Sequence, residues 1–208
     1  MARFSIIIPA YNAEDRIRKV LDSVKQQSFH DYECIVVCDS CKDKTQEIVE
    51  SYGFTAVPVE FHNDGLSRSK GLDLAQGEDE LYLDDDDWWL HEYVLRQLND
   101  KLAKEPTDIL CFSFIWKGIG YASPYSNGGY LYPSVWNKCW KREAIGDTRF
   151  PNVYSISDYK FHCKMMNKRL KITAWDMPMY YYNYLREGSI SQQMGRTVNG
   201  TKNYWENH

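Results

Sequence analysis

The sequence predicts an α/β protein in which helices cover both faces of a mostly parallel sheet. In the first 105 residues, short apolar runs rich in β-branched residues alternate with stretches that carry apolar residues at helical spacing. This alternation is typical of parallel strands joined by right-handed helical crossovers. Polar residues follow several of the apolar runs directly, and in open α/β sheets ligands bind beyond the carboxyl ends of the strands.

The elements can be assigned in order from these patterns. The predicted strands cover residues 4–8, 34–38, 57–61, 81–83, 109–115, 171–175 and 179–184. The predicted helices follow Asn12, begin near Thr45, cover 66–76 and 92–103, and begin again at Ser157. Asn12 and Ser157 are the expected N-caps of their helices. We expect a single domain, 1–208, whose halves 1–105 and 106–208 meet near Glu105.

Four consecutive carboxylates, Asp84 to Asp87, stand between Leu83 and the pair Trp88-Trp89. Adjacent like charges repel by roughly 1 kcal/mol per close pair even in water, so a folded protein keeps such a run where something neutralises it. A divalent cation is the natural partner, because Mg²⁺ and Mn²⁺ take carboxylate and phosphate oxygens. The alternative is a solvated acidic turn, which the apolar flanks disfavour. An EF-hand is excluded, since Trp89 stands where its loop requires glycine.

Composition narrows the functional classes. The net charge is −4 with scattered basic residues, which argues against a nucleic-acid partner. Six cysteines in 208 residues do not make a disulfide scaffold, and no stretch approaches the roughly 20 apolar residues of a membrane span. We therefore expect a cytoplasmic protein, for which peripheral membrane association stays open. Cys38-x-x-Cys41 invites a zinc or redox interpretation, but no second Cys or His pair has partner spacing.

A series of motifs, in their order along the chain, resembles glycosyltransferase family 2. Its parts are Ile6-Ile-Ile-Pro-Ala-Tyr-Asn12, Val36 to Thr45, Gly65 to Gly71, Tyr82 to Trp88, Trp136 to Glu143, Arg149-Phe-Pro151, Ser157-Asp158 and Tyr180-Tyr-Tyr182. The ordered series is more specific than a single Asp-x-Asp motif. The resemblance implies the GT-A fold, a Rossmann-like mostly parallel sheet with a small acceptor-binding lobe in the second half.

The resemblance also implies a reaction and a site. A sugar would pass from a nucleoside diphosphate sugar, a UDP-sugar, to a carbohydrate or lipid-linked acceptor hydroxyl with inversion, in polysaccharide or glycoconjugate synthesis. Asp158 would be the general base, and Asp86 and Asp84 would hold Mn²⁺ or Mg²⁺. The implied nucleotide-sugar contacts are Pro9, Ala10, Tyr11, Asn12, Glu14, Asp39, Arg68, Asp84 and Asp85. Trp88, Trp136 and Trp140 would contact the acceptor, and Arg68 or Arg186 would assist the phosphates.

The chain departs from the family pattern at several of these motifs. Cys38 stands where the family has an acid or Asn, and Ser157 replaces the Glu that often precedes the base, which removes one carboxylate from the acceptor site. Two other functions fit parts of the pattern. A sugar nucleotidyltransferase also uses carboxylates and metal, but its glycine-rich phosphate loop is missing after the first strand. A catalytically inactive nucleotide-sugar-binding module would keep the fold without transfer.

Overall fold

The computed structural model describes residues 2–126, 128–153, 156–184 and 186–187. The strands are β1 (Phe4–Ala10), β2 (Tyr32–Asp39), β3 (Thr55–Val59), β4 (Asp79–Tyr82), β5 (Trp88–Trp89), β6 (Ile109–Trp116), β7 (Gly120–Ala122), β8 (Lys138–Lys141) and β9 (Ile172–Tyr182). The helices are α1 (Ile17–Lys25), α2 (Thr45–Ser51), α3 (Asp64–Leu74), α4 (Val94–Lys104), α5 (Arg142–Ile145) and α6 (Ser157–Met166).

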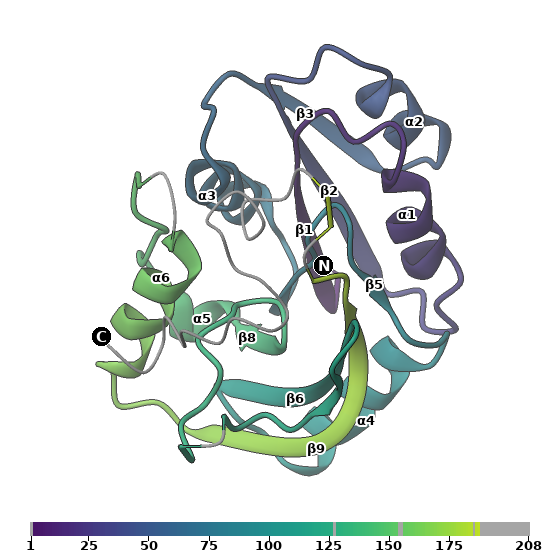
Figure 1. Ribbon diagram of the computed structural model, residues 1–208. Coiled ribbons are helices and arrows are strands. Elements are labelled where there is room, and N and C mark those ends of the chain that lie inside the picture. The colour runs from purple at the N-terminus through teal and green to yellow at the C-terminus, as the bar shows by residue number, and fades with distance from the viewer. Residues whose placement is uncertain (1, 127, 154–155, 185, 188–208) are drawn as a thin grey trace.

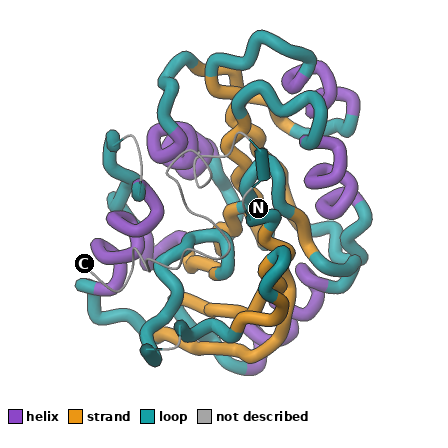
Figure 2. The backbone as a smooth tube through the Cα atoms, in the orientation of Figure 1, coloured by secondary structure: helices purple, strands orange, loops and turns teal. Residues whose placement is uncertain are grey.

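The described strands form one sheet in the order β3-β2-β1-β4-β8-β6-β9-β5, with β7 paired to β6. Figures 1 and 2 show that this sheet is curled. The first four strands of this order are parallel, and β8 is inserted antiparallel between β4 and β6. The antiparallel strands β5 and β7 pair with β9 and β6. The predicted α/β class and mostly parallel sheet are therefore confirmed, and strands from both halves of the chain belong to one sheet.

The sheet separates two hydrophobic cores, because successive side chains of a strand point to opposite faces. In β1, Phe4, Ile6 and Ile8 face the core that contains the apolar residues of α1, α2 and α4. Ile7 faces the second core, which contains those of α3, α5 and α6. Figure 1 shows α1 and α2 on one side of β1 and β2 and α3 on the other. Both faces are therefore covered, as the near-continuous apolar runs of these strands predicted.

Several predicted boundaries are wrong. Asn12 does not cap α1: the helix begins at Ile17, and the Asn12 side chain turns away to accept a hydrogen bond from the Lys42 N–H. Ser157 is the first residue of α6 and not its cap, since Ile156 precedes it in a left-handed conformation and the Ser157 hydroxyl bonds elsewhere. The third strand begins two residues earlier than predicted.

The second half differs more from prediction. Two short strands were expected where the structure has the single strand β9. β9 stays continuous because its pairing with β6 shifts register on both sides of Ser113. The loop predicted at 118–129 contains the short strand β7, and the stretch without a clear period at 133–142 contains β8. Short strands carry too few residues for a periodic pattern. Among the described residues, no helix is long and apolar enough to cross a membrane.

Glu80 is a buried carboxylate whose desolvation lowers the stability of the fold. It lies fully buried in β4, and neither carboxylate oxygen accepts a hydrogen bond from any residue that the structure describes. The nearest cation is Arg142, whose Nε lies 4.0 Å from Oε1. Burial, only partly opposed by Arg142, raises the pKa of Glu80 to about 8. At neutral pH the folded protein therefore holds a proton that the unfolded chain releases.

The raised pKa of Glu80 predicts that the stability of the protein depends on pH. Unfolding releases the bound proton between the ordinary glutamate pKa and about 8, so the free energy of unfolding should fall as pH rises through that window. Glu80→Gln, which is neutral at every pH, should remove this slope and stabilise the protein at pH 7.5 by about 4 kcal/mol. Thermal unfolding at pH 5 and 7.5 measures it, with the exposed Glu143→Gln as control. Parallel pH curves for wild type and Glu80→Gln would contradict it.

Candidate functional site

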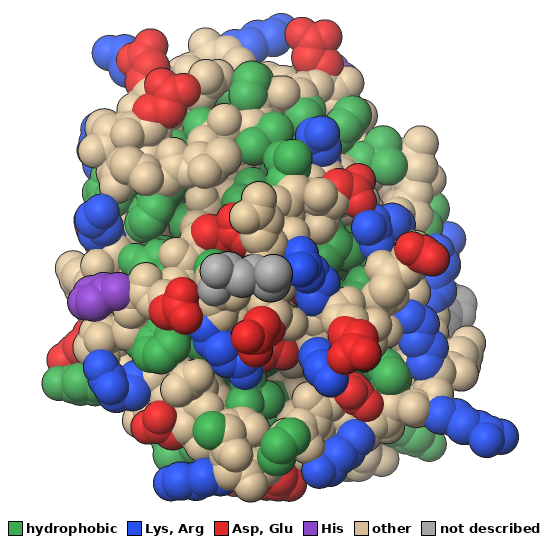
Figure 3. All heavy atoms as spheres, turned by 180° about the vertical axis from the view of Figure 1, so that it is seen from behind, with side chains coloured by type: hydrophobic (Ala, Val, Ile, Leu, Met, Phe, Trp, Pro, Cys, Tyr) green, Lys and Arg blue, Asp and Glu red, His purple; other side chains and the backbone are tan. Residues whose placement is uncertain are grey.

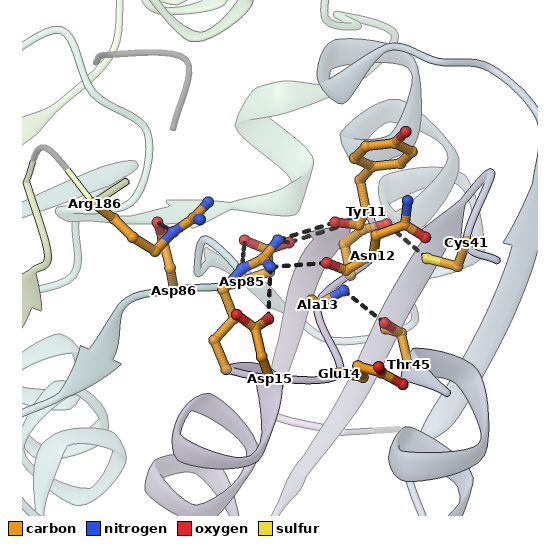
Figure 4. Close-up of polar contacts among 12 residues, drawn as sticks. Tyr11, Asn12, Ala13, Glu14, Asp15, Cys41, Thr45, Asp85, Asp86 and Arg186 are labelled. Carbon is orange, nitrogen blue, oxygen red and sulfur yellow. Dashed lines mark hydrogen bonds and ion pairs between the residues drawn. The ribbon is translucent and has the colours of Figure 1, made fainter. Parts of the chain in front are cut away.

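The candidate site lies where β1, β2 and β4 end. The chain leaves β1 through Tyr11, which is exposed, and Asn12, which has a positive φ of 42°. Glu14 accepts a hydrogen bond from the Lys44 N–H, so the loop after β1 is held against the loop after β2. Of the predicted contacts in β1 itself, Ala10 is buried and Pro9 is half-buried. Figure 4 shows Tyr11, Asn12 and Glu14 along one rim of the site.

Asp39, at the end of β2, is saturated with hydrogen bonds from the protein itself. Its carboxylate accepts the backbone N–H groups of Phe61, His62 and Asn63 at 2.8–2.9 Å. It also accepts the hydroxyls of Ser40 (2.9 Å) and Ser67 (3.0 Å). Burial alone would raise the pKa of Asp39, but these donors stabilise the charged form and lower it. Asp39 thus joins β2 to the loop that leads into α3.

Arginines from three separate elements neutralise the acidic run after β4. Asp84 pairs with Arg68 of α3 (2.6 Å), Asp85 with Arg16 before α1 (2.7 Å), and Asp86 with Arg186 after β9 (2.6 Å). Figure 4 shows Asp85 beside the loop after β1 and Asp86 facing Arg186. The repulsion that predicted a metal is therefore offset by the protein's own cations, and charge balance by itself does not require one.

The fourth acid, Asp87, has a different environment. It is fully buried and accepts hydrogen bonds from the Tyr180 hydroxyl (2.6 Å) and the Asn183 N–H (2.8 Å). Burial and the charges of Asp86 and Asp84 raise its pKa well above the ordinary value. The Tyr180 hydroxyl also accepts the Asp84 N–H at 3.2 Å. Asp87 therefore attaches the acidic run to β9 through Tyr180.

Asp158 lies in the first turn of α6, within electrostatic reach of Arg68 and Asp84. It is half-buried, and its Oδ1 accepts the Tyr159 N–H at 2.9 Å. Burial raises its pKa, Arg68 opposes the shift, and Asp84 adds to it. The structure thus brings Asp158 together with the acids after β4 and with Arg68, although they are far apart in the sequence. A carboxylate with a raised pKa is a stronger proton acceptor once ionised.

Asp84 and Asp86 fit a hard divalent cation. Among the described residues, no three Asp, Glu, His or Cys side chains form a metal cage. Mg²⁺ and Mn²⁺ are however usually held by one or two carboxylates together with substrate phosphates. Asp84 Oδ1 and Asp86 Oδ2 bond to arginines. In the described part of the chain, the second oxygen of each accepts no hydrogen bond, which leaves two hard oxygen donors.

The three tryptophans predicted to contact an acceptor are engaged in packing. The structure contradicts the prediction for Trp140, which is fully buried and donates its indole N–H to the Val135 carbonyl. Trp88 lies between Lys19, whose Nζ is 3.1 Å from the ring centre, and a stacked Tyr181 ring at 4.2 Å. Trp136 is 7% exposed and stacks on Tyr180. Contacts of Trp88 or Trp136 with an acceptor stay predictions.

Sequence reasoning missed Arg16, Asp64 and the exposed tyrosines. Arg16 carries no local signal, because its partner Asp85 lies 69 positions away. Asp64 resembled a turn residue in Asn63-Asp-Gly65. Tyr130, at 79% exposure, and Tyr121, at 51%, are far more exposed than Trp136 and Trp140.

On the face opposite to that of Figure 1, acidic, basic and hydrophobic side chains are intermixed (Figure 3).

Three comparisons place the chain among known proteins. The family model described as Glycosyl transferase family 2 matches residues 5–171. TuaG of Bacillus subtilis, named for teichuronic acid biosynthesis, is 35% identical over 95% of this chain and 84% of its own. Poly(ribitol-phosphate) beta-N-acetylglucosaminyltransferase TarS of Staphylococcus aureus is 27% identical over 90% of this chain. This chain spans 36% of TarS and 24% of glycosyltransferase GlyA of Streptococcus pneumoniae.

Solved structures match the fold. The structure of TarS residues 1–349 with UDP-GlcNAc superposes with a TM-score of 0.78 at 25% identity and covers 91% of this chain and 60% of that one. Glucosyl-3-phosphoglycerate synthase from Mycobacterium tuberculosis, solved with Mn²⁺ and UDP, gives 0.69 at 17% identity, over 93% and 75% of the two chains. The second likeness shows the fold alone. The predicted GT-A fold is therefore confirmed.

The Arg16–Asp85 pair predicts a measurable loss of stability. Arg16→Ala leaves Asp85, 14% exposed, without its ion-pair partner, so that the Tyr11 N–H is its remaining donor, and it removes the donor to the Tyr11 and Asn12 carbonyls. We expect the free energy of unfolding in urea to fall by about 2 kcal/mol. The exposed neighbour Arg18→Ala is the control and should cost under about 0.5 kcal/mol. An equal loss in both variants would show that the ion pair contributes little.

Proposed function

The chain belongs to glycosyltransferase family 2, and we propose that it transfers a sugar from a UDP-sugar to an acceptor hydroxyl with inversion at the anomeric carbon. The observation that carries the proposal is the meeting of Asp158, Arg68 and Asp84 beyond the carboxyl edge of the sheet. These residues come from α6, α3 and the end of β4. A proton acceptor therefore lies beside the acids that would hold the donor.

The donor and acceptor classes are inferred from relatives. TarS, which is 25% identical to this chain in the aligned structure, was solved with UDP and with UDP-GlcNAc. TarS is named for transfer to poly(ribitol-phosphate), and TuaG for teichuronic acid biosynthesis. We propose that this chain likewise takes a UDP-sugar and glycosylates a hydroxyl-rich polymer of a cell-surface polysaccharide or polyol phosphate.

Each step of the reaction has a residue to perform it. Asp158 accepts the proton of the acceptor hydroxyl as its oxygen attacks the anomeric carbon. The bond from that carbon to the β-phosphate oxygen breaks, and its electron pair leaves with the diphosphate. Arg68 lies beside both Asp84 and Asp158 and is buried, so its charge acts in a low-dielectric setting. The predicted donor contacts Pro9 to Asn12 and Glu14, together with Asp85, would hold the nucleotide.

Mn²⁺ or Mg²⁺ would be held by Asp84 and Asp86 and would neutralise charge on the diphosphate when bound. Because Asp39 already accepts five protein donors, its predicted contact with uracil or ribose would be indirect. We propose that it shapes the nucleotide site through the 61–63 loop. Arg186 is the counter-ion of Asp86 and lies where the second half of the chain reaches the acids.

The proposed metal site predicts that UDP binding depends on a divalent cation. Calorimetric titration with UDP should give at least tenfold weaker binding in the presence of a chelator than with Mn²⁺, about 1.4 kcal/mol. Asp86→Asn should abolish that difference, because it removes a charged metal ligand. Asp15→Asn, an exposed acid of the neighbouring loop, is the control and should bind like wild type. Equal affinity with and without chelator would remove the metal from donor binding.

Asp158→Asn separates a transferase from an inactive binding module. If Asp158 is the base, the variant should bind UDP and Mn²⁺ with wild-type affinity but lose about 10² to 10⁴ in kcat. If Asp158 only stabilises the first turn of α6, the cost should be small, since Asn is also favourable near a helix N-terminus. Steady-state transfer from UDP-GlcNAc to a polyol-phosphate polymer provides the measurement, with exposed Asp147→Asn as control. Turnover within a fewfold of wild type would exclude Asp158 as the base.

A further inference from the structure

The N-termini of α3 and α6 meet at unusually close range. A Cβ at Gly65 would lie 2.8 Å from the Pro151 carbonyl oxygen and 2.9 Å from the Ser157 Cβ, so only glycine permits the approach. Ser157 is fully buried in this contact, and Asp158 follows it directly in the first turn of α6. The position of Asp158 therefore depends on how α6 is attached to α3.

Asp64, the first residue of α3, makes that attachment. One of its oxygens, Oδ2, accepts the Ser157 hydroxyl at 2.8 Å and also pairs with Nη1 of Arg68. The other end of the same guanidinium, Nη2, donates to Asp84 at 2.6 Å. A continuous chain of hydrogen bonds thus runs from Ser157 through Asp64 and Arg68 to Asp84.

Asp64 is not occupied as a helix cap. Asn63 caps α3, since its Oδ1 accepts the Leu66 N–H at 2.9 Å. The Asp64 carboxylate points across to α6 and to Arg68 instead. An acid at this position also stabilises the helix dipole, but only by about 0.5 kcal/mol, and that interaction needs neither Ser157 nor Arg68.

We propose that Asp64 is a positioning residue that fixes the turn bearing Asp158 relative to the Arg68–Asp84 ion pair, and so sets the base against the donor. This inference rests on the proposed function. It also accounts for the serine at 157: the carboxylate at this contact is supplied by α3, and a short hydroxyl on α6 completes the hydrogen bond. Arg68 is thereby held by Asp64 and Asp84 on either side, which keeps its guanidinium from collapsing onto Asp158.

The first test measures position without activity. In Asp64→Ala, the amides of residues 161–164, which bond within α6, should exchange with deuterium at least tenfold faster than in wild type. Amides of α1 should keep their rates. UDP affinity with Mn²⁺ should stay within threefold, because Arg68 keeps its ion pair with Asp84 when Asp64 is removed. Unchanged exchange in α6, or a tenfold loss of UDP affinity, would overturn the proposal.

The second test exchanges the two side chains. Asp64→Ala should lower kcat about 10- to 100-fold with little change in the KM for donor, and Ser157→Asp should also lower kcat, because two carboxylates would then face each other. The double variant Asp64→Ser with Ser157→Asp restores one carboxylate and one hydroxyl at this contact. It should recover kcat to within about fivefold of wild type. Absence of recovery in a double variant with wild-type thermal stability would overturn the proposal.

The outcomes distinguish this inference from the proposed function. If Asp158→Asn impairs transfer but Asp64→Ala does not, the reaction stands and the positioning role falls. If neither affects transfer and α6 exchange nevertheless rises in Asp64→Ala, then the contact fixes α6 but Asp158 is not the base, and the positioning role in catalysis falls with it.

Discussion

The constraint on which the site depends is the mutual repulsion of four consecutive aspartates at the end of β4. A folded chain tolerates this run because each acid has its own partner from a distant element: Arg68, Arg16 and Arg186 for the first three, and Tyr180 with the Asn183 N–H for Asp87. Breaking one pair would leave a partly buried charge uncompensated, which costs more than the pair itself contributes. The same ion pairs that neutralise the acidic run therefore also hold the surrounding segments in place.

A second consequence concerns the metal. The acidic run was expected to need a cation for neutralisation, and the arginines already supply it. A divalent ion that binds Asp84 and Asp86 would share these carboxylates with Arg68 and Arg186 and would bring net positive charge to the edge of the sheet. That charge is suited to a diphosphate, which is itself strongly negative. Metal and nucleotide would then bind more favourably together than either alone, because each offsets the charge that the other introduces.

The fold and the edge at which the site lies were predictable from the sequence, whereas the connections within the site were not. Apolar periodicity located β1, β2 and α1 to within a few residues, and the acids marked the end of β4. The Arg16–Asp85 and Asp64–Ser157 contacts join residues 69 and 93 positions apart, and no local pattern records them. Likewise, tryptophan rings are suited to stacking on sugars, which led to the acceptor prediction. Trp140 lies in the core instead, because large aromatic rings bury the most area there.

The two halves of the chain share one sheet and meet at the acidic run. β8, from the second half, lies between β4 and β6 in the sheet, and β9 carries the tyrosine that bonds Asp87. Arg186 then reaches back to Asp86. A shift of β9 relative to β4 would disturb the acidic run directly, and a shift of α6 relative to α3 would disturb Asp158 and Arg68 together. The geometry between Asp158, the proposed base, and the acids is thus set by the sheet and by the contact between α3 and α6, both of which join the first half of the chain to the second.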